Sequence, residues 1–316
     1  MSHTLTRHDL YELCVQSPKH LVPFLRAVHG GEPRVLGEDF AGTAALSRLW
    51  ADASPESRAI AVDLDGDALG YHADHPRVAK REANVLEVSD PADVIFVGNF
   101  SIGYWHTRVD LVAYLRHVHK RLSSPVTDGG GGPPTAGRRG SSRTNASGLL
   151  QDPPSASLHS APPPSAPQRG PAEGTGLFLC DTYGGESAFL IGGVHRDHWI
   201  PKEDRFGEHA GKRIRYTWEQ RHADPLTGMV TDVLHFRVES GGTIELELDE
   251  AFVYEWRLWS VPELRDAMLE AGFVSTEVYA KTGNAVDDEG NVYVLPVEDA
   301  EEELDDSFIV MVAART

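Results

Sequence analysis

The chain has 316 residues, with 29 Lys or Arg against 48 Asp or Glu, so its formal net charge is −19. This acidity argues against nucleic acid or an anionic membrane as the main partner, because both attract clustered positive charge. No run of about 18 apolar residues predicts a transmembrane helix, and the polar N-terminus does not read as a signal peptide. The two cysteines, Cys14 and Cys180, lie far apart without a disulfide pattern, which favours a reducing, cytoplasmic location.

The first 123 residues alternate between helices and short apolar strands. Thr107, followed three residues later by Asp110, has the spacing of a capping box at a helix start. Buried apolar strands separated by helices are typical of a parallel sheet that is covered on both faces. The predicted helices are residues 18–29, 44–50, 64–73 and 108–122, and the predicted strands are residues 34–36, 58–63, 78–85 and 93–98.

Two segments depart from the average composition. Residues 124–173 contain 10 of the 20 prolines and no Phe, Trp or Tyr. Such a stretch has too little apolar surface to offset chain entropy, so we predict that it is a disordered insert. Residues 287–306 contain ten acidic residues and no basic residue, which indicates a solvated acidic loop.

The second half continues the alternation and adds a different pattern. Residues 177–181 form a fifth apolar strand, and from residue 213 apolar and polar residues alternate around turns at 224–228 and 241–242. This period of two predicts a three-stranded antiparallel sheet over about residues 212–257. Ser260 with Glu263 predicts a helix start, Gly272 its end, and residues 273–280 and 308–313 two final strands.

These elements predict an α/β chain. Its doubly wound, Rossmann-like sheet is built from residues 1–123 and 174–316, interrupted by the insert at 124–173 and extended by the antiparallel subdomain. Ligands of such folds bind beyond the carboxyl ends of the strands. Gly42 there permits close backbone approach, and Asp63 ends the second strand, where a carboxylate can accept the ribose hydroxyls of a nucleoside. The GxGxxG pattern of dinucleotide binding is absent.

At these positions the chain resembles class I methyltransferases that use S-adenosylmethionine. An antiparallel insertion after the fifth strand is similar to that of small-molecule N-methyltransferases. The chain departs from the family pattern in three places, because Phe40 and Ala44 stand where glycine is usual and Asn84 stands where an acid is usual. The segments that carry the resemblance are residues 38–44, 62–65, 84–85, 98–104 and 269–273.

The resemblance implies a seven-stranded sheet, S-adenosyl-L-methionine as the cofactor and a small-molecule acceptor, with nitrogen favoured over oxygen as the methylated atom. The net charge and the lack of a long apolar run disfavour a nucleic acid or membrane partner, and the lack of HExxH or clustered cysteines disfavours a metal. The residues expected at the cofactor are Tyr11, Glu38, Phe40, Gly42, Thr43, Asp63, Leu64, Asn84, Val85, Asn99 and Phe100, and those expected at the reacting amine are Tyr104, His106, Tyr183 and Glu186.

Simpler roles stay open for several of these residues. Asp63 can cap a helix, Asn99 can form a turn, Tyr11 can pack, and His106 can lie on the surface. Two other functions also stay open. The chain could be a binding protein that keeps the fold without turnover, which Phe40 and Ala44 favour, or an oxidoreductase with a nucleotide cofactor, which the absence of GxGxxG disfavours.

Overall fold

A computed structural model of the protein describes residues 4–16, 18–124, 176–202, 205–280, 285–286, 292–299 and 304–316. Apart from Ser124, the predicted insert lies outside the described residues, as do residues 287–291 and 300–303 of the predicted acidic loop. The described residues before and after the insert nevertheless belong to one compact unit.

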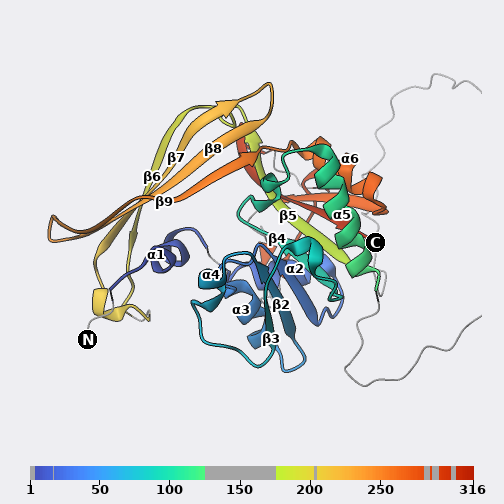
Figure 1. The fold of residues 1–316 in the computed structure, drawn as a ribbon, viewed down its shortest axis with the longest axis horizontal. Coiled ribbons are helices and arrows are strands. Elements are labelled where there is room, and N and C mark those ends of the chain that lie inside the picture. The colour runs from blue at the N-terminus through green and yellow to red at the C-terminus, as the bar shows by residue number, and fades with distance from the viewer. Residues whose placement is uncertain are drawn as a thin grey trace, which may run out of the picture. The chain divides into compact units, whose positions relative to one another are not determined.

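A seven-stranded sheet, called here the large sheet, forms the centre of this unit (Figure 1). Its order is β10-β13-β5-β4-β1-β2-β3, and β3, β2, β1, β4 and β5 run parallel while β13 is antiparallel to both of its neighbours. This confirms the predicted doubly wound arrangement. The strands are β1 (Val35–Asp39), β2 (Arg58–Asp63), β3 (Val78–Glu82), β4 (Val94–Val97), β5 (Leu177–Gly185), β10 (Ser275–Ala280) and β13 (Ser307–Arg315).

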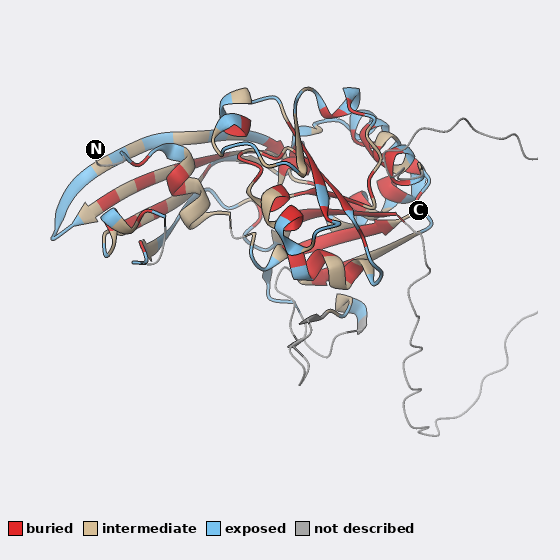
Figure 2. Cartoon of the chain, turned by 90° about the horizontal axis from the view of Figure 1, so that it is seen from below, coloured by how far each residue is buried: buried red, intermediate tan, exposed pale blue. Residues whose placement is uncertain are grey.

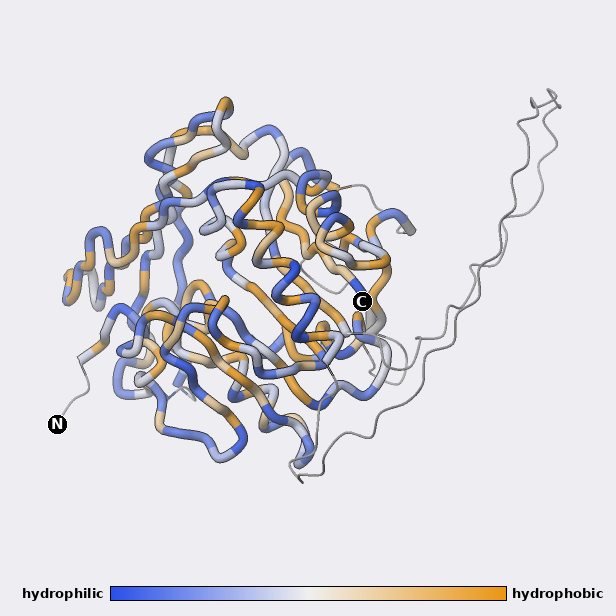
Figure 3. Tube along the Cα trace, turned by 45° about the vertical axis from the view of Figure 1, so that its right-hand side comes forward, coloured by the Kyte–Doolittle hydropathy of each residue, from blue (hydrophilic) through white to orange (hydrophobic). Residues whose placement is uncertain are grey.

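Helices cover both faces of the large sheet, so its central strands β1, β4 and β5 are largely buried (Figure 2). On one face α2 (Leu21–His29) and α3 (Ala45–Ala53) pack Phe24 and Trp50 against the strands. On the other face lie α5 (Arg108–Leu122) and α6 (Val261–Ala271). Figure 3 shows that the hydrophobic residues gather along these central elements, as burial of both faces requires.

Local capping explains where these helices begin and end. The side chain of Thr107 accepts from the backbone of Asp110, Ser260 and Glu263 form a reciprocal capping box, and Gly272 ends α6 with φ 116°. These confirm the predicted starts of α5 and α6 and the predicted end of α6. The helix predicted over 64–73 is wrong in length, because only α4 (Gly66–Gly70) forms, and its terminal glycines favour the helix poorly.

Several elements are absent from the sequence prediction, namely α1, β6 and the short strands β11 and β12. The helix α1 (Arg7–Cys14) begins with a capping box between Thr6 and Asp9. The antiparallel sheet, called here the small sheet, has four strands, so the predicted three-stranded sheet is wrong by one strand. Its strands are β6 (Gly192–Trp199), β7 (Arg213–Asp224), β8 (Met229–Ser240) and β9 (Thr243–Arg257), and a separate pair is formed by β11 (Ala285–Val286) and β12 (Val292–Tyr293).

The missing strand, β6, lies at the edge of the small sheet and is exposed along most of its length. An edge strand with little burial leaves no alternation of apolar and polar residues to detect. The neighbouring β7 and β8 do alternate, because Ile214, Tyr216 and Phe236 face an apolar cluster that includes Leu10 of α1. The small sheet therefore packs on α1 with one face and is solvated on the other.

A buried ion pair fixes the end of β1 to α5. Asp39 is fully buried and accepts from Arg121 Nη1 at 2.8 and 2.9 Å and from Tyr114 Oη at 2.8 Å. Arg121 is itself only 2% exposed. Removing one partner of such a pair strongly destabilises the folded protein, because the remaining charge stays buried without a counter-charge.

We predict that Arg121→Met lowers the free energy of unfolding by about 3–5 kcal/mol. The matched control is Arg237→Met, which removes the exposed pair with Glu247 and should cost about 0–1 kcal/mol. Urea unfolding of both variants measures this difference. Equal losses in the two variants would show that Asp39 does not depend on its buried partner.

Candidate functional site

The turn between β1 and α3 places three residues in the left-handed backbone conformation. These are Phe40, Gly42 and Ala44, with φ of 60°, 53° and 58°. A residue with a side chain pays about 1–2 kcal/mol for this conformation, which glycine adopts freely. Phe40 and Ala44, which stand where the sequence resemblance expects glycine, therefore adopt a backbone that glycine adopts without strain.

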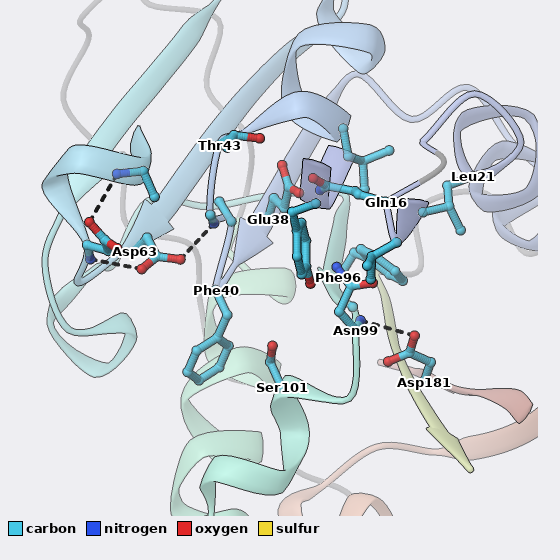
Figure 4. A pocket seen from close by; sticks show the side chains of 18 of the residues that line it. Gln16, Leu21, Glu38, Phe40, Thr43, Asp63, Phe96, Asn99, Ser101 and Asp181 are labelled. Carbon is cyan, nitrogen blue, oxygen red and sulfur yellow. Dashed lines mark hydrogen bonds between the residues drawn. The ribbon is translucent and has the colours of Figure 1, made fainter. Parts of the chain in front are cut away.

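The side chain of Phe40 is held on one side of this turn. Its ring stacks on Tyr104 at 5.7 Å between centroids and meets Trp105 and Tyr114 edge-on at 6.3 Å. In Figure 4 the ring points toward the segment that contains Ser101, away from Glu38 and Thr43. Aromatic pairs contribute about 0.5–1.5 kcal/mol each, so this packing offsets the backbone strain at Phe40.

Asp63 ties the turn to the end of β2. Its Oδ2 accepts from the Gly42 amide at 2.7 Å, and its Oδ1 accepts from the Asp65 amide at 2.9 Å (Figure 4). A carboxylate oxygen can accept more than one hydrogen bond, so Asp63 retains capacity for ligand hydroxyls. No atom lies within 4 Å of where a Gly42 Cβ would be, so the turn borders open space.

That open space belongs to a cavity of about 1030 Å³, called here the strand-tip cavity. It lies at the carboxyl ends of β1, β2, β4 and β5, where ligands of open α/β sheets bind. Its volume is at the upper end of the roughly 300–1,000 Å³ of ligand pockets. Of the residues predicted at the cofactor, all but Phe100 line it, namely Tyr11, Glu38, Phe40, Gly42, Thr43, Asp63, Leu64, Asn84, Val85 and Asn99.

The four residues predicted at the reacting amine are not brought together. Tyr104 lines the strand-tip cavity, whereas His106, Tyr183 and Glu186 do not. The exposed His106 has Nε2 2.9 Å from the carbonyl oxygen of Glu255. Tyr183 donates to Gln220 Oε1 at 3.1 Å and Asp232 Oδ2 at 3.2 Å. Glu186 lies at the exposed end of β5, so Tyr104 is the member of this set that can reach a ligand in the cavity.

Asp181 is a cavity residue outside the predicted set. It directly follows the part of β5 that pairs with β4, and it accepts from the backbone amides of Asn99 at 3.1 Å and Phe100 at 2.7 Å, two residues with φ of 54° and 62°. The ring of Phe100 then turns toward Tyr183, 5.0 Å away, and out of the cavity. The signal that identifies Asp63, an acid at the carboxyl end of a predicted strand, also applies to Asp181, the last residue of the strand predicted over 177–181.

The N-terminal helix supplies a further wall that the sequence motifs do not indicate. Arg7, His8 and Tyr11 of α1 line the cavity, together with Phe252 and Tyr254 of β9. The Tyr11 and Phe252 rings lie 5.0 Å apart, so α1 and the small sheet meet over the strand tips. By contrast, Trp259 is a packing residue, since it is 1% exposed and donates to the carbonyl of Trp105.

A polar junction anchors α1 to the turn. Glu12 Oε1 accepts from Thr43 Oγ1 at 2.5 Å and lies 2.7 Å from His72 Nε2, and Glu12 Oε2 accepts from Arg205 at 2.7 Å. Burial raises the pKa of Glu12, but the hydrogen bonds from His72 and Thr43 outweigh burial and hold it below its usual value. Glu12 is therefore an ionised link between α1 and the turn.

Glu38, which lines the strand-tip cavity, differs from Glu12 in its ionisation. It is 4% exposed and accepts from Ser47 N at 2.9 Å and Ser47 Oγ at 2.6 Å. Burial raises its pKa to about 7, and the Ser47 hydrogen bonds only partly oppose this. The cavity thus contains one carboxyl group whose charge changes near neutral pH.

A metal site and a membrane-spanning helix are both absent from the described ranges. There, no group of three or more His, Cys, Asp or Glu residues is arranged to hold a metal ion. His195 and His198 lie three residues apart on strand β6, so their side chains point to opposite faces of the small sheet. In the same ranges, none of the helices is long and apolar enough to cross a membrane.

Comparison with known proteins places the fold. No protein family's sequence profile matches the chain, and no curated protein matches its sequence. The chain is similar in structure to the sugar N-methyltransferase KedS8 from a Streptoalloteichus species, at 12% identity and a TM-score of 0.55, over 99% of this chain and 95% of that one.

Two further solved structures agree. One is CalS10, an amino pentose methyltransferase of Micromonospora echinaspora bound to S-adenosylmethionine, at 12% identity and TM-score 0.55, over 100% of this chain and 99% of that one. The other is an S-adenosylmethionine-dependent methyltransferase of Clostridium acetobutylicum, at 14% identity and TM-score 0.53, over 97% and 96%. The chain has the fold of class I methyltransferases, with the inserted antiparallel subdomain.

The left-handed backbone of the turn predicts that alanine destabilises the protein at Gly42 but not at Gly70. Gly42→Ala should lower the free energy of unfolding by about 1–2 kcal/mol, because alanine resists the left-handed conformation. Gly70→Ala is the control, since Gly70 also faces open space but lies in α4 without a positive φ, and there alanine should be neutral or stabilising. Thermal or urea unfolding compares the variants, and equal effects would contradict the account of the turn.

Glu38 predicts a pH dependence of stability. Because its folded pKa of about 7 exceeds the unfolded value of 4.5, folding takes up a proton between these values. Its contribution to stability is complete below about pH 4.5 and declines as pH rises through 7, by roughly 3 kcal/mol in all.

The variant Glu38→Gln accepts the Ser47 hydrogen bonds without ionising. Its free energy of unfolding should therefore fall less between about pH 5 and pH 8 than that of the wild type, and urea unfolding across this range measures both. Parallel pH profiles would show that Glu38 ionises normally.

Proposed function

We propose that the protein transfers a methyl group from S-adenosyl-L-methionine to a small-molecule acceptor, at an amine nitrogen. The observation that carries the proposal is the left-handed turn of Phe40, Gly42 and Ala44, joined through the Gly42 amide to Asp63 at the edge of the strand-tip cavity. Phe40 and Ala44 stand where the resembling methyltransferases usually have glycine, so this backbone is strained here. Such strain is typical of functional sites, and close approach of a ligand to the backbone would explain it.

The residues present fit this cofactor. Asp63 would accept the ribose hydroxyls, and Leu64, Asn84 and Val85 would flank the adenine. The turn from Phe40 to Thr43 would hold the methionine part, because the missing Cβ of Gly42 leaves that side open. Tyr11 would cover the cofactor from α1, and Glu38 and Asn99 would lie beside it.

When bound, the cofactor supplies a methyl group that is already activated on a sulfonium sulfur. The protein's work is then to exclude water and to orient the amine. Tyr104, Phe252 and Tyr254 give the cavity an aromatic wall, and Asp63 and Asp181 give it negative charge, a combination that attracts a cationic amine centre. The attacking amine must be neutral, so a bound ammonium group first gives a proton to solvent water. Tyr104 can then accept a hydrogen bond from the neutral amine and so orient its lone pair.

An amine acceptor is further supported by the comparisons, since KedS8 and CalS10 are described as methyltransferases of a sugar nitrogen and of an amino pentose. A cytoplasmic location is part of the same proposal. Cys14 and Cys180 are both free thiols, as a reducing compartment maintains.

A second function deserves a test because three of the four residues predicted at the amine lie outside the strand-tip cavity. In this alternative, the protein binds the cofactor without transferring its methyl group. A nicotinamide-dependent oxidoreductase is the weaker alternative, since the turn lacks GxGxxG.

Incubation with methyl-labelled S-adenosylmethionine and a panel of amines, including amino sugars, separates these functions. Our proposal expects label on one class of amine and release of S-adenosylhomocysteine. Tight binding without transfer would favour the binding protein, and binding of a nicotinamide cofactor in place of S-adenosylmethionine would overturn the proposal.

The cofactor position predicts the effect of Asp63→Ala. Loss of the carboxylate removes its hydrogen bonds to the ribose, so affinity for S-adenosylhomocysteine should fall about tenfold or more in calorimetric titration. The control is Asp67→Ala, an exposed acid of α4 that does not line the cavity, which should bind normally. Unchanged affinity in Asp63→Ala would contradict the assignment.

A further inference from the structure

A second cavity, of about 830 Å³, lies beside the edge strand of the small sheet and is called here the β6 cavity. Its walls come from the far end of β5, from β6 and β7, and from the start of β13. The lining is mainly apolar and includes the aromatic side chains of Tyr183, Trp218 and Phe308. Its volume matches that of a small-molecule pocket.

Large apolar side chains are exposed around this cavity. Leu190, Ile191 and Val194, on and just before β6, are 66%, 67% and 59% exposed, and Leu295 and Leu304 are exposed on its other side. Single exposed apolar residues are ordinary, but a contiguous group marks a binding surface. These side chains would lose contact with water if a ligand filled the cavity.

Among the described residues that line the cavity, Arg196 is a cation and Asp305, just before β13, is a carboxylate. Arg196 shares a face of β6 with Val194, and within the described ranges no carboxylate forms a salt bridge with it. The adjacent Asp197 is already paired with Arg213 and Arg215. A guanidinium beside apolar and aromatic walls recognises an anionic group carried on an apolar body.

The β6 cavity is separate from the strand-tip cavity. Asp181 lines the first cavity and Tyr183 the second, about 7 Å further along the same face of β5. Between them stands the ring of Phe100, which stacks on Trp218 at 5.6 Å and meets Tyr183 at 5.0 Å. Phe100 lines neither cavity, and the two cavities share no lining residue.

We propose that the β6 cavity is a second ligand site, which binds a small molecule with an aromatic or apolar body and one anionic group. The anionic group pairs with Arg196, and the body lies against Trp218, Tyr183 and the exposed side chains of β6. This site goes beyond the methyl transfer proposed above and does not depend on it.

Fluorescence titration with anilinonaphthalene sulfonate, an aromatic anion, tests the site. The native protein should bind the probe saturably, with one probe per chain, and near-ultraviolet circular dichroism should show intact tertiary structure. Ile191→Asp, at an exposed position, should abolish binding. Val253→Asp is the matched control, because Val253 is an exposed apolar residue of the same sheet that lines neither cavity.

The charge and the location are tested separately. Arg196→Gln should weaken the sulfonate probe about tenfold and leave the uncharged phenylnaphthylamine unchanged. Saturating S-adenosylhomocysteine should not displace either probe. Absence of saturable binding, equal loss in Ile191→Asp and Val253→Asp, or displacement by S-adenosylhomocysteine would overturn the proposal. If the native protein does not bind the probe but forms a dimer, and Ile191→Asp dissociates that dimer, this face would instead bind a second copy of the chain.

Discussion

The backbone of the β1–α3 turn is the constraint on which the site depends. Phe40, Gly42 and Ala44 all take a left-handed conformation, so the chain reverses tightly and presents the Gly42 amide to Asp63. Without this reversal α3 would not begin where it does, and Ser47 would not reach Glu38. The strain at two side-chain-bearing residues is compensated nearby, by the aromatic contacts of Phe40 and the full burial of Ala44.

Two carboxylates, Asp63 and Asp181, hold the loops that border the strand-tip cavity. Asp63 ends β2, and Asp181 directly follows the part of β5 that pairs with β4; each accepts backbone amides of a neighbouring loop that contains left-handed residues. Each carboxylate thus holds a loop in the form that leaves the strand tips open. The same carboxylates make the cavity acidic, which suits a cationic cofactor and an amine, and α1 closes it through the ionised Glu12.

Much of the fold was predictable from local sequence signals. The strand at 58–63 and the caps at Thr107 and Ser260 agree with the structure, because short-range periodicity and hydrogen bonding decide them. β6 was missed because an exposed edge strand has no apolar period. The separation of Tyr183 from Tyr104 depends on which way Phe100 turns, and the lining by Phe252 depends on how the small sheet packs on α1. Both are tertiary facts that no local pattern encodes.

The most direct measurement is an experimental structure of the protein crystallised with S-adenosylhomocysteine. We expect the ribose at Asp63, the amino acid part at the turn of Phe40 to Thr43, and the sulfur facing Tyr104, with the left-handed backbone of the turn unchanged. A nucleoside bound elsewhere, or a Phe40 ring that fills the space of the methionine part, would contradict the proposed cofactor site.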